Sequence, residues 1–210
     1  LFGYAHVPWM KRHQRLIDEA ALPGTLARLR QFVASRAALE RSGYVMVGLD
    51  HFAHPDDPLV AGPRFRNFQG YTTDDAATLI GVGASAIGSL PQGYVQNAAE
   101  VPAWRKDIAA GQPAVVRGFA LDATDRFRRA VIERLMCDLS VDIADIAERF
   151  GYDPAELAAS FDALAPLAED GLVAIDGWRV AVGEDGRAFL RLICAAFDAY
   201  WTRGCGSKAL

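Results

Sequence analysis

The chain has 210 residues, 51% of them hydrophobic and 23% charged, with a formal net charge of −4 at neutral pH. This composition is typical of a globular protein with one large core or two small ones, and it excludes bulk electrostatic recruitment to nucleic acid or to an anionic membrane. No apolar run reaches the roughly 18 residues that a membrane-spanning helix needs. Three cysteines at unrelated spacings, Cys137, Cys194 and Cys205, indicate buried, inert thiols in a reducing cytoplasm rather than a disulfide framework.

The chain opens on an apolar segment, residues 1–7, which ends at Pro8 and predicts a buried strand. It shows no initiator methionine and no basic stretch before an apolar run, so we expect no targeting segment and a chain cut from a longer protein. Pro23 and Gly24 then precede a helix that Ser42 and Gly43 end. Its apolar positions recur at helical spacing: Leu26, Leu29, Phe32, Val33 and Leu39.

Residues 44–49 predict a second buried strand, so strand, loop, helix and strand follow one another as in one unit of a parallel α/β sheet. From residue 50 to residue 117 the chain is rich in glycine, proline and aromatic residues. This composition predicts a long irregular segment, and such segments in compact proteins usually carry function.

A different unit begins after residue 117. Asp122 caps a helix and has Asp125 three residues on, and further helices are predicted over 142–150 and 153–171. A hairpin with Asp176 and Gly177 at its turn follows. A final helix over 187–201 completes a winged-helix-like unit. We therefore expect the divisions 1–117, 118–203 and a tail at 204–210.

The winged-helix pattern would suggest DNA binding, but the charges argue against it. From residue 153 to residue 170, where a recognition helix would lie, there is no lysine or arginine, and phosphate contacts dominate such binding. Five acidic residues occupy the stretch: Asp153, Glu156, Asp162, Glu169 and Asp170. A packing or lid role is the better interpretation.

Four features could bind ligands, and each has a structural alternative. Residues 50–57 include His51 and His54 among carboxylates, which suggests either a metal site or, preferably, a loop of hydrogen-bonded side chains and caps. His6 follows the first strand and could be a site residue or a satisfied polar group. The glycine-rich turn 81–88 could approach a ligand closely or allow tight strand packing. Residues 67–73 alternate amides and hydroxyls with aromatic rings, which suggests either a site for a flat ligand with polar edges or, preferably, a surface loop held in place by its aromatic side chains.

Several stretches closely resemble the oxygen-independent coproporphyrinogen III oxidases, and the Asn67–Thr73 run is the most specific of them. The resemblance covers nearly the whole chain. The stretches are residues 3–8, 14–23, 48–57, 66–73, 83–87, 94–97, 117–121, 129–137 and 164–172.

This resemblance implies an α/β fold: the last strands of an incomplete parallel radical S-adenosylmethionine (SAM) barrel, followed by a mainly helical, winged-helix-like domain. It implies two SAM molecules and a [4Fe–4S] cluster that cleaves one of them, so that a 5′-deoxyadenosyl radical takes hydrogen from substrate propionates. Coproporphyrinogen III would become protoporphyrinogen IX in haem synthesis. By motif position, Ala5 would contact a second SAM, Ile87 would pack against the cluster-bound SAM, and Phe68 and Gln69 would belong to the SAM and substrate pocket. No catalytic residue and no metal ligand is carried over.

The chain departs from the family pattern in two places. The Cys-x3-Cys-x2-Cys motif that binds the cluster is absent, so the cluster would belong to a missing N-terminal part and this chain alone is expected to be inactive. The loop over residues 58–63 is shorter than is usual in the family. The resemblance further implies a cytoplasmic monomer without nucleic-acid or membrane partners.

A haem-binding chaperone of the same superfamily is the alternative. That branch tends to have a Tyr-Trp pair where Asn67–Thr73 lies, so the residues present here favour the oxidase.

Overall fold

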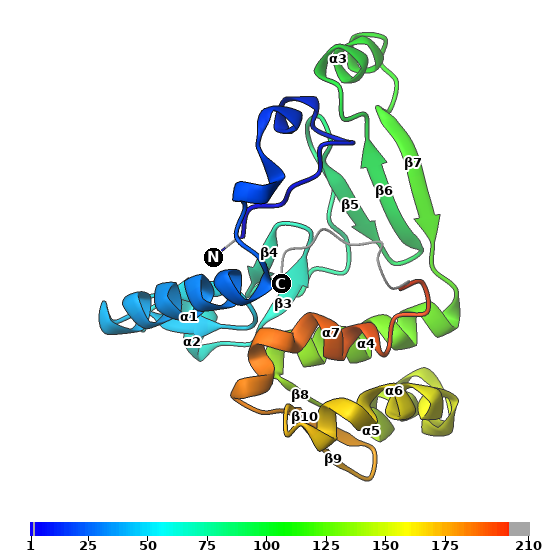
Figure 1. The fold of residues 1–210 in the computed structure, drawn as a ribbon. Coiled ribbons are helices and arrows are strands. Elements are labelled where there is room, and N and C mark those ends of the chain that lie inside the picture. Colours follow the sequence, from blue (N-terminus) through cyan, green and yellow to red (C-terminus); the bar gives the residue numbers. More distant parts are fainter. Residues whose placement is uncertain (2, 202–210) are drawn as a thin grey trace.

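The computed structural model describes residue 1 and residues 3–201, in which an N-terminal part stands on a helical C-terminal part (Figure 1). The predicted tail at 204–210 and Cys205 lie outside the described residues. The N-terminal part contains η1 (Arg12–Leu16), η2 (Glu19–Ala21), α1 (Thr25–Arg41), β1 (Val45–Val47), β2 (His51–Ala53), α2 (Pro58–Ala61), β3 (Phe65–Asn67), β4 (Gly70–Thr72), β5 (Ile87–Leu90), β6 (Gly93–Asn97), α3 (Val101–Ala109) and β7 (Val115–Ala120). The C-terminal part contains α4 (Ala123–Asp138), β8 (Ser140–Asp142), α5 (Ile143–Phe150), η3 (Pro154–Leu157), α6 (Ala158–Glu169), β9 (Val173–Asp176), β10 (Arg179–Val182), η4 (Asp185–Phe189) and α7 (Leu190–Ala195).

Residue 1 and residues 3–7 form no strand, which corrects the prediction for residues 1–7. A side chain makes hydrogen bonds to the backbone of this segment instead. The buried Gln14 amide accepts the Val7 N–H at 2.6 Å and donates to the Ala5 carbonyl at 3.1 Å, as a neighbouring strand would do. The backbone groups of Ala5 and Val7 are therefore satisfied without a neighbouring strand.

Helix α1 forms where predicted, and Gly43 follows it with φ +86°. Its apolar positions are less buried than the predicted stripe implies. Leu26 and Val33 are 60% and 55% exposed, and within the described residues α1 contributes no buried side chain.

The second predicted strand exists as β1, but it pairs with β2 and is antiparallel to it, with Val47 opposite His51. Three residues connect the two strands, and Gly48 at φ +57° makes the reversal. So short a connection permits only antiparallel pairing. Every strand pair recorded among the described residues is antiparallel, so the parallel pairing expected between the first two segments is not present there.

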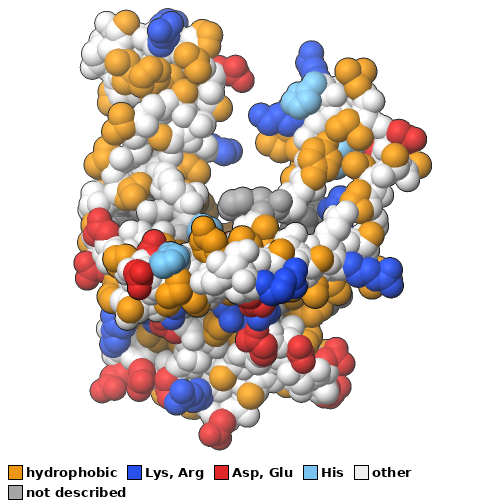
Figure 2. Space-filling view, turned by 90° about the vertical axis from the view of Figure 1, so that its left-hand side faces the viewer, with side chains coloured by type: hydrophobic (Ala, Val, Ile, Leu, Met, Phe, Trp, Pro, Cys, Tyr) orange, Lys and Arg blue, Asp and Glu red, His pale blue; other side chains and the backbone are white. Residues whose placement is uncertain are grey.

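The stretch 50–117 is more regular than predicted. It holds the β3–β4 hairpin and the three-stranded sheet β5-β6-β7, in which a two-residue turn at Pro91–Gln92 joins β5 to β6. Strand β7 forms one edge of this sheet, and all six of its residues are exposed. Figure 2 shows a hollow between two upright parts of the molecule, above the C-terminal base.

The C-terminal part confirms the winged-helix-like prediction. Asp122 and Asp125 form a reciprocal capping box at the start of α4, and Asp142 caps α5. The wing is the sheet β8-β10-β9, which turns at Asp176 and Gly177 as expected. Its core consists of side chains that are essentially inaccessible to solvent: Phe127, Val131, Leu135, Ile143, Leu157, Leu164, Val180, Leu190, Ile193 and Phe197.

The last helix is shorter than predicted, because α7 ends at Ala195. Beyond it the backbone tightens into bonds of i to i−3 type, such as Phe197 N–H to the Cys194 carbonyl at 3.0 Å. The Arg128 guanidinium accommodates this end by donating to the Phe197 carbonyl at 3.1 Å. The tight turn places the Phe197 ring in the core.

Arginines of the C-terminal part fasten the N-terminal part to it. Arg129 donates to Ser89 Oγ at 3.2 Å and lies 5.1 Å from the centre of the Tyr94 ring, which holds the β5-β6-β7 sheet against α4. Arg187 donates to the carbonyls of Met46 and Gly48, each at 3.2 Å, and so connects η4 to the end of β1. Among the described residues, no helix is long and apolar enough to cross a membrane.

Candidate functional site

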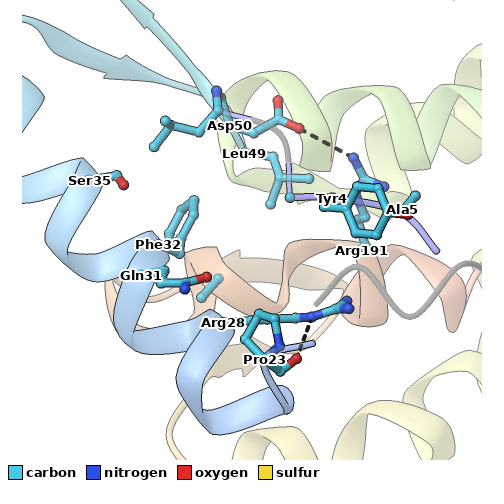
Figure 3. A pocket seen from close by; sticks show the side chains of 13 residues that line it. Tyr4, Ala5, Pro23, Arg28, Gln31, Phe32, Ser35, Leu49, Asp50 and Arg191 are labelled. Atoms are coloured by element: carbon cyan, nitrogen blue, oxygen red, sulfur yellow. Dashed lines mark hydrogen bonds and ion pairs between the residues drawn. The ribbon is translucent and has the colours of Figure 1, made fainter. Parts of the chain in front are cut away.

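A cavity of about 680 Å³ lies where four segments meet: the N-terminal segment, α1, the β1–β2 turn and the η4–α7 region (Figure 3). Its volume falls within the range of about 300–1,000 Å³ that small-molecule sites occupy. The small residues Gly3 and Ala5 and the rings of Tyr4 and Phe32 form part of the wall. The cavity therefore combines apolar surface with the few polar groups described next, as ligand sites do.

Asp50 is the acidic group of the wall. Its side chain is 12% exposed, and it accepts a hydrogen bond from Arg191 Nη2 at 3.2 Å, which Figure 3 marks. Its other oxygen pairs with His51 Nδ1 at 2.8 Å. The amino group of Leu1 also donates to the Asp50 backbone carbonyl. Asp50 thus joins the N-terminal segment, the β1–β2 turn and α7 at one point.

Basic and neutral polar groups line the opposite wall. Arg28 donates from Nε to the Pro23 carbonyl at 3.0 Å, which orients its side chain along the cavity (Figure 3). Gln31 and Ser35 follow on the same helix, α1. A ligand with a carboxylate and an ammonium group would find complementary charges on Arg28, Arg191 and Asp50.

Of the four residues assigned by resemblance, Ala5 lines this cavity and the other three do not. Phe68 and Gln69 lie in the turn between β3 and β4, where the Asn67 side chain accepts the N–H of Gln69 at 2.9 Å and of Gly70 at 3.1 Å. The Phe68 ring meets Tyr94 of β6 edge-on at 5.1 Å, so the turn leans on the β5-β6-β7 sheet.

Ile87 starts β5 and is half-buried opposite Gln96. The glycine-rich turn before it is held by Asn97, whose side chain donates to the carbonyls of Gly81 at 3.1 Å and Gly83 at 2.9 Å. A Cβ added at Gly81 would lie 2.9 Å from the Ile87 backbone carbon. At Gly81 the structure therefore favours tight backbone packing over ligand approach.

The polar side chains of the histidine loop bond to one another and cap a helix. Among the described residues there is no group of three or more His, Cys, Asp or Glu side chains that could hold a metal ion. His54 is 68% exposed and pairs with Asp56, while Asp57 caps α2 by accepting the Leu59 N–H at 2.9 Å. His51 instead bonds Asp50, at the edge of the cavity.

His6 is a satisfied polar group. Its Nδ1 is 3.1 Å from the Tyr4 hydroxyl and its Nε2 is 3.1 Å from Glu19, with only 11% of the side chain exposed. Tyr4 lines the cavity, so His6 supports that wall from behind.

The described cysteines do not fit an iron–sulfur cluster, whose ligands are thiolates at close spacing. Burial raises the pKa of the Cys137 thiol to about 11 and that of the Cys194 thiol to about 12. The two side chains lie in different hydrophobic clusters and face no cavity wall described above.

Sequence reasoning missed Arg28 and Arg191 as cavity residues. Arg28 lies outside the apolar positions predicted for its helix, and Arg191 reaches Asp50 across 141 positions of sequence. Asp50 directly follows the predicted strand 44–49, and this position is a local signal for the site.

Comparison with a solved structure defines the class of fold. The structure titled "Coproporphyrinogen III oxidase (HemN) from Escherichia coli is a Radical SAM enzyme" superposes with a TM-score of 0.87 at 39% sequence identity. The match covers 94% of this chain and 47% of that chain. The described fold is therefore that of one part of a radical SAM protein.

Sequence comparisons name the family. Residues 121–189 match the HemN C-terminal domain. An oxygen-independent coproporphyrinogen III oxidase from Bradyrhizobium diazoefficiens is 48% identical over 97% of this chain, and one from Escherichia coli is 40% identical over 95% of it. The chain spans about half the length of these relatives, 46% and 45% respectively. The resemblance found in the sequence is thus confirmed: the chain matches one part of the oxygen-independent coproporphyrinogen III oxidases.

Proposed function

We propose that this chain is part of an enzyme that converts two propionate groups of coproporphyrinogen III to vinyl groups, giving protoporphyrinogen IX without oxygen. Similarity to the Bradyrhizobium relative over 97% of this chain is the observation that supports the proposal most strongly. Each propionate would lose one hydrogen atom, one CO2 and one electron. The hydrogen atom would go to a radical derived from SAM and the electron to an external acceptor.

The proposal assigns the cluster to a polypeptide segment other than the described one, because the thiols described here do not fit it. A [4Fe–4S] cluster, when bound, supplies the electron that cleaves SAM. The residues of this chain would then bind and orient ligands and exclude water. Shielding matters because a radical intermediate reacts with any hydrogen donor that reaches it.

The cavity at Ala5 would bind one SAM molecule, the second of two. Its volume, the ring of Phe32 and the charges of Asp50, Arg28 and Arg191 suit an adenosyl group that carries an amino-acid moiety. Ile87 would pack against the other SAM. Phe68 and Gln69, exposed at the tip of the β3–β4 turn, would reach that SAM and the tetrapyrrole.

The proposal also includes a cytoplasmic, monomeric parent without nucleic-acid or membrane partners. The net charge of −4 supports the absence of nucleic-acid and anionic-membrane partners, as does helix α6, which has acidic and no basic residues. Acidic side chains are frequent on the C-terminal base in Figure 2.

The test is anaerobic turnover by the full-length parent with its cluster reconstituted. With SAM and coproporphyrinogen III, we expect two molecules of CO2 for each protoporphyrinogen formed, and no turnover by residues 1–210 alone. A saturable Soret shift on haem addition, without turnover by the parent, would support a haem chaperone and overturn the oxidase.

A further inference from the structure

Three side chains connect the cavity to the turn that carries Phe68 and Gln69. Arg191 donates to one oxygen of Asp50 at 3.2 Å, and His51 donates from Nδ1 to the other at 2.8 Å. A carboxylate only accepts hydrogen bonds, so the pair places the imidazole proton on Nδ1. This contact fixes which edge of the ring faces away from Asp50.

The far edge of the His51 ring faces the β3–β4 hairpin. A Cβ built on Gly70 would lie 2.6 Å from His51 Nε2, so the ring occupies the space that any side chain at position 70 would need. Gly70 also has φ +138°, a conformation that favours glycine. The Tyr71 ring meets the imidazole edge-on at 5.0 Å and closes the other side.

A shift of Gly70 cannot be confined to that residue. The Asn67 side chain bonds the N–H groups of both Gln69 and Gly70, which makes residues 67–70 one compact turn. The position of the imidazole therefore bears on where Phe68 and Gln69 point.

We propose that His51 is a positioning residue that couples the cavity at Ala5 to the Phe68–Gln69 turn. Asp50 bonds the ring on the cavity side, and the other edge of the ring packs against Gly70 in the turn. The inference rests on the proposed function in one respect: both ends of this connection would face ligands of the same reaction. His51 acts through Gly70 and is not itself assigned a contact with substrate.

Two substitutions separate this role from simple packing. His51→Phe keeps a ring against Gly70 but removes the donor to Asp50. His51→Asn keeps a donor near the Nδ1 position but removes the ring edge from Gly70. Coupling needs both contacts, so both substitutions should disturb the turn, whereas a packing role would leave His51→Phe unaffected. His54→Phe is the matched control, because His54 is 68% exposed in the same loop.

The experiment uses the full-length parent and has two measurements. Hydrogen exchange at the amides of Gln69 and Gly70 should become about tenfold faster in both His51 variants. The amount of 5′-deoxyadenosine formed per protoporphyrinogen should rise about tenfold, because a misplaced substrate is not attacked after SAM cleavage. The His54→Phe protein should match the wild type in both.

The outcomes distinguish this inference from the proposed function. The His51→Phe protein could show the wild-type rate of hydrogen exchange and the wild-type amount of 5′-deoxyadenosine per protoporphyrinogen. That result would overturn the positioning role and leave the proposed function intact. Faster exchange in the variants, in a parent that never decarboxylates coproporphyrinogen III, would support the positioning role and overturn the proposed function. If His51→Phe does not fold, the same measurements on His51→Asn decide, and an undisturbed turn in that protein would overturn the inference.

Discussion

The Tyr71 hydroxyl joins three segments at a single atom. It accepts the Leu49 N–H at 3.0 Å and donates to the Met136 carbonyl at 2.9 Å, so the β1–β2 turn and α4 meet on β4. Burial is the main cause that raises the pKa of this phenol, and the hydroxyl therefore remains a donor across the physiological range.

Replacing Tyr71 by phenylalanine should destabilise the protein by about 1–3 kcal/mol, because Leu49 N–H and the Met136 carbonyl would lose their partner inside the structure. Urea unfolding measures the change. Tyr44→Phe, at a tyrosine that is 42% exposed, should change the free energy of unfolding by less than about 0.5 kcal/mol. Equal effects of the two substitutions would contradict the bridging role.

The buried thiols give a prediction about reactivity. Since burial raises the pKa of Cys137 to about 11 and of Cys194 to about 12, only a trace of thiolate exists at pH 8, and the thiolate is the reactive form. Both residues should resist iodoacetamide in the native protein and react fully in urea. Peptide mass spectrometry reads each site separately, and rapid native labelling at either one would refute their burial.

At the scale of elements, two neighbouring residues, Asp122 and Asp125, determine where helix α4 begins. Asp122 accepts the Asp125 N–H at 2.7 Å, and the Asp125 carboxylate accepts the Asp122 N–H at 3.1 Å. The helix that begins there, α4, carries Arg129, which holds the β5-β6-β7 sheet against the C-terminal part. Its first turn therefore bears on both parts of the molecule.

Asp122→Ala should lower stability by about 1 kcal/mol, the usual cost of removing an N-cap. The melting temperature should fall by about 2–4 °C, as expected for a chain of this length. Differential scanning calorimetry gives both quantities. Asp75→Ala, at an exposed aspartate in a loop, serves as the control and should leave the melting temperature unchanged.

Local signals explain which elements were predictable. The cap at Asp122, the hairpin turn at Asp176 and the stop at Gly43 act within a few residues, and all three form as expected. The sheet β5-β6-β7 was not predicted, because the glycines in its strands were taken to indicate an irregular segment. There, Gly88 and Gly118 instead allow backbones to approach, with a Cβ at Gly118 lying 2.9 Å from the Tyr94 carbonyl.

The candidate site was predictable only in part. Ala5 was assigned by resemblance and does line the cavity. Arg191 and Asp50 meet across most of the chain, and periodicity carries no information about such a contact. The assignment of Ala5 to a SAM site stays a prediction, and so do those of Phe68, Gln69 and Ile87, which lie away from the cavity wall.

At the scale of the whole molecule, nearly all of the main core belongs to one unit. Apart from Leu49, every buried member of that cluster lies between Phe127 and Phe197. Strand β7 ends at Ala120, and the family match begins at residue 121. We therefore propose that a C-terminal unit is independently stable from about residue 121, close to the boundary inferred from sequence.

A fragment of residues 121–201 should fold alone, with a helical circular dichroism spectrum and a cooperative thermal transition. The complementary fragment, residues 1–120, buries few large side chains and should melt without cooperativity. A non-cooperative transition for the 121–201 fragment would show that its core depends on the N-terminal part.

The cavity wall combines Gly3, Tyr4 and Ala5 with Ala188 and Arg191. These residues come from the N-terminal segment and from the η4–α7 region, so the wall is complete only when both are folded in place. Local unfolding of either one would open the cavity. A ligand that bound there would therefore stabilise the docking of the two segments against each other.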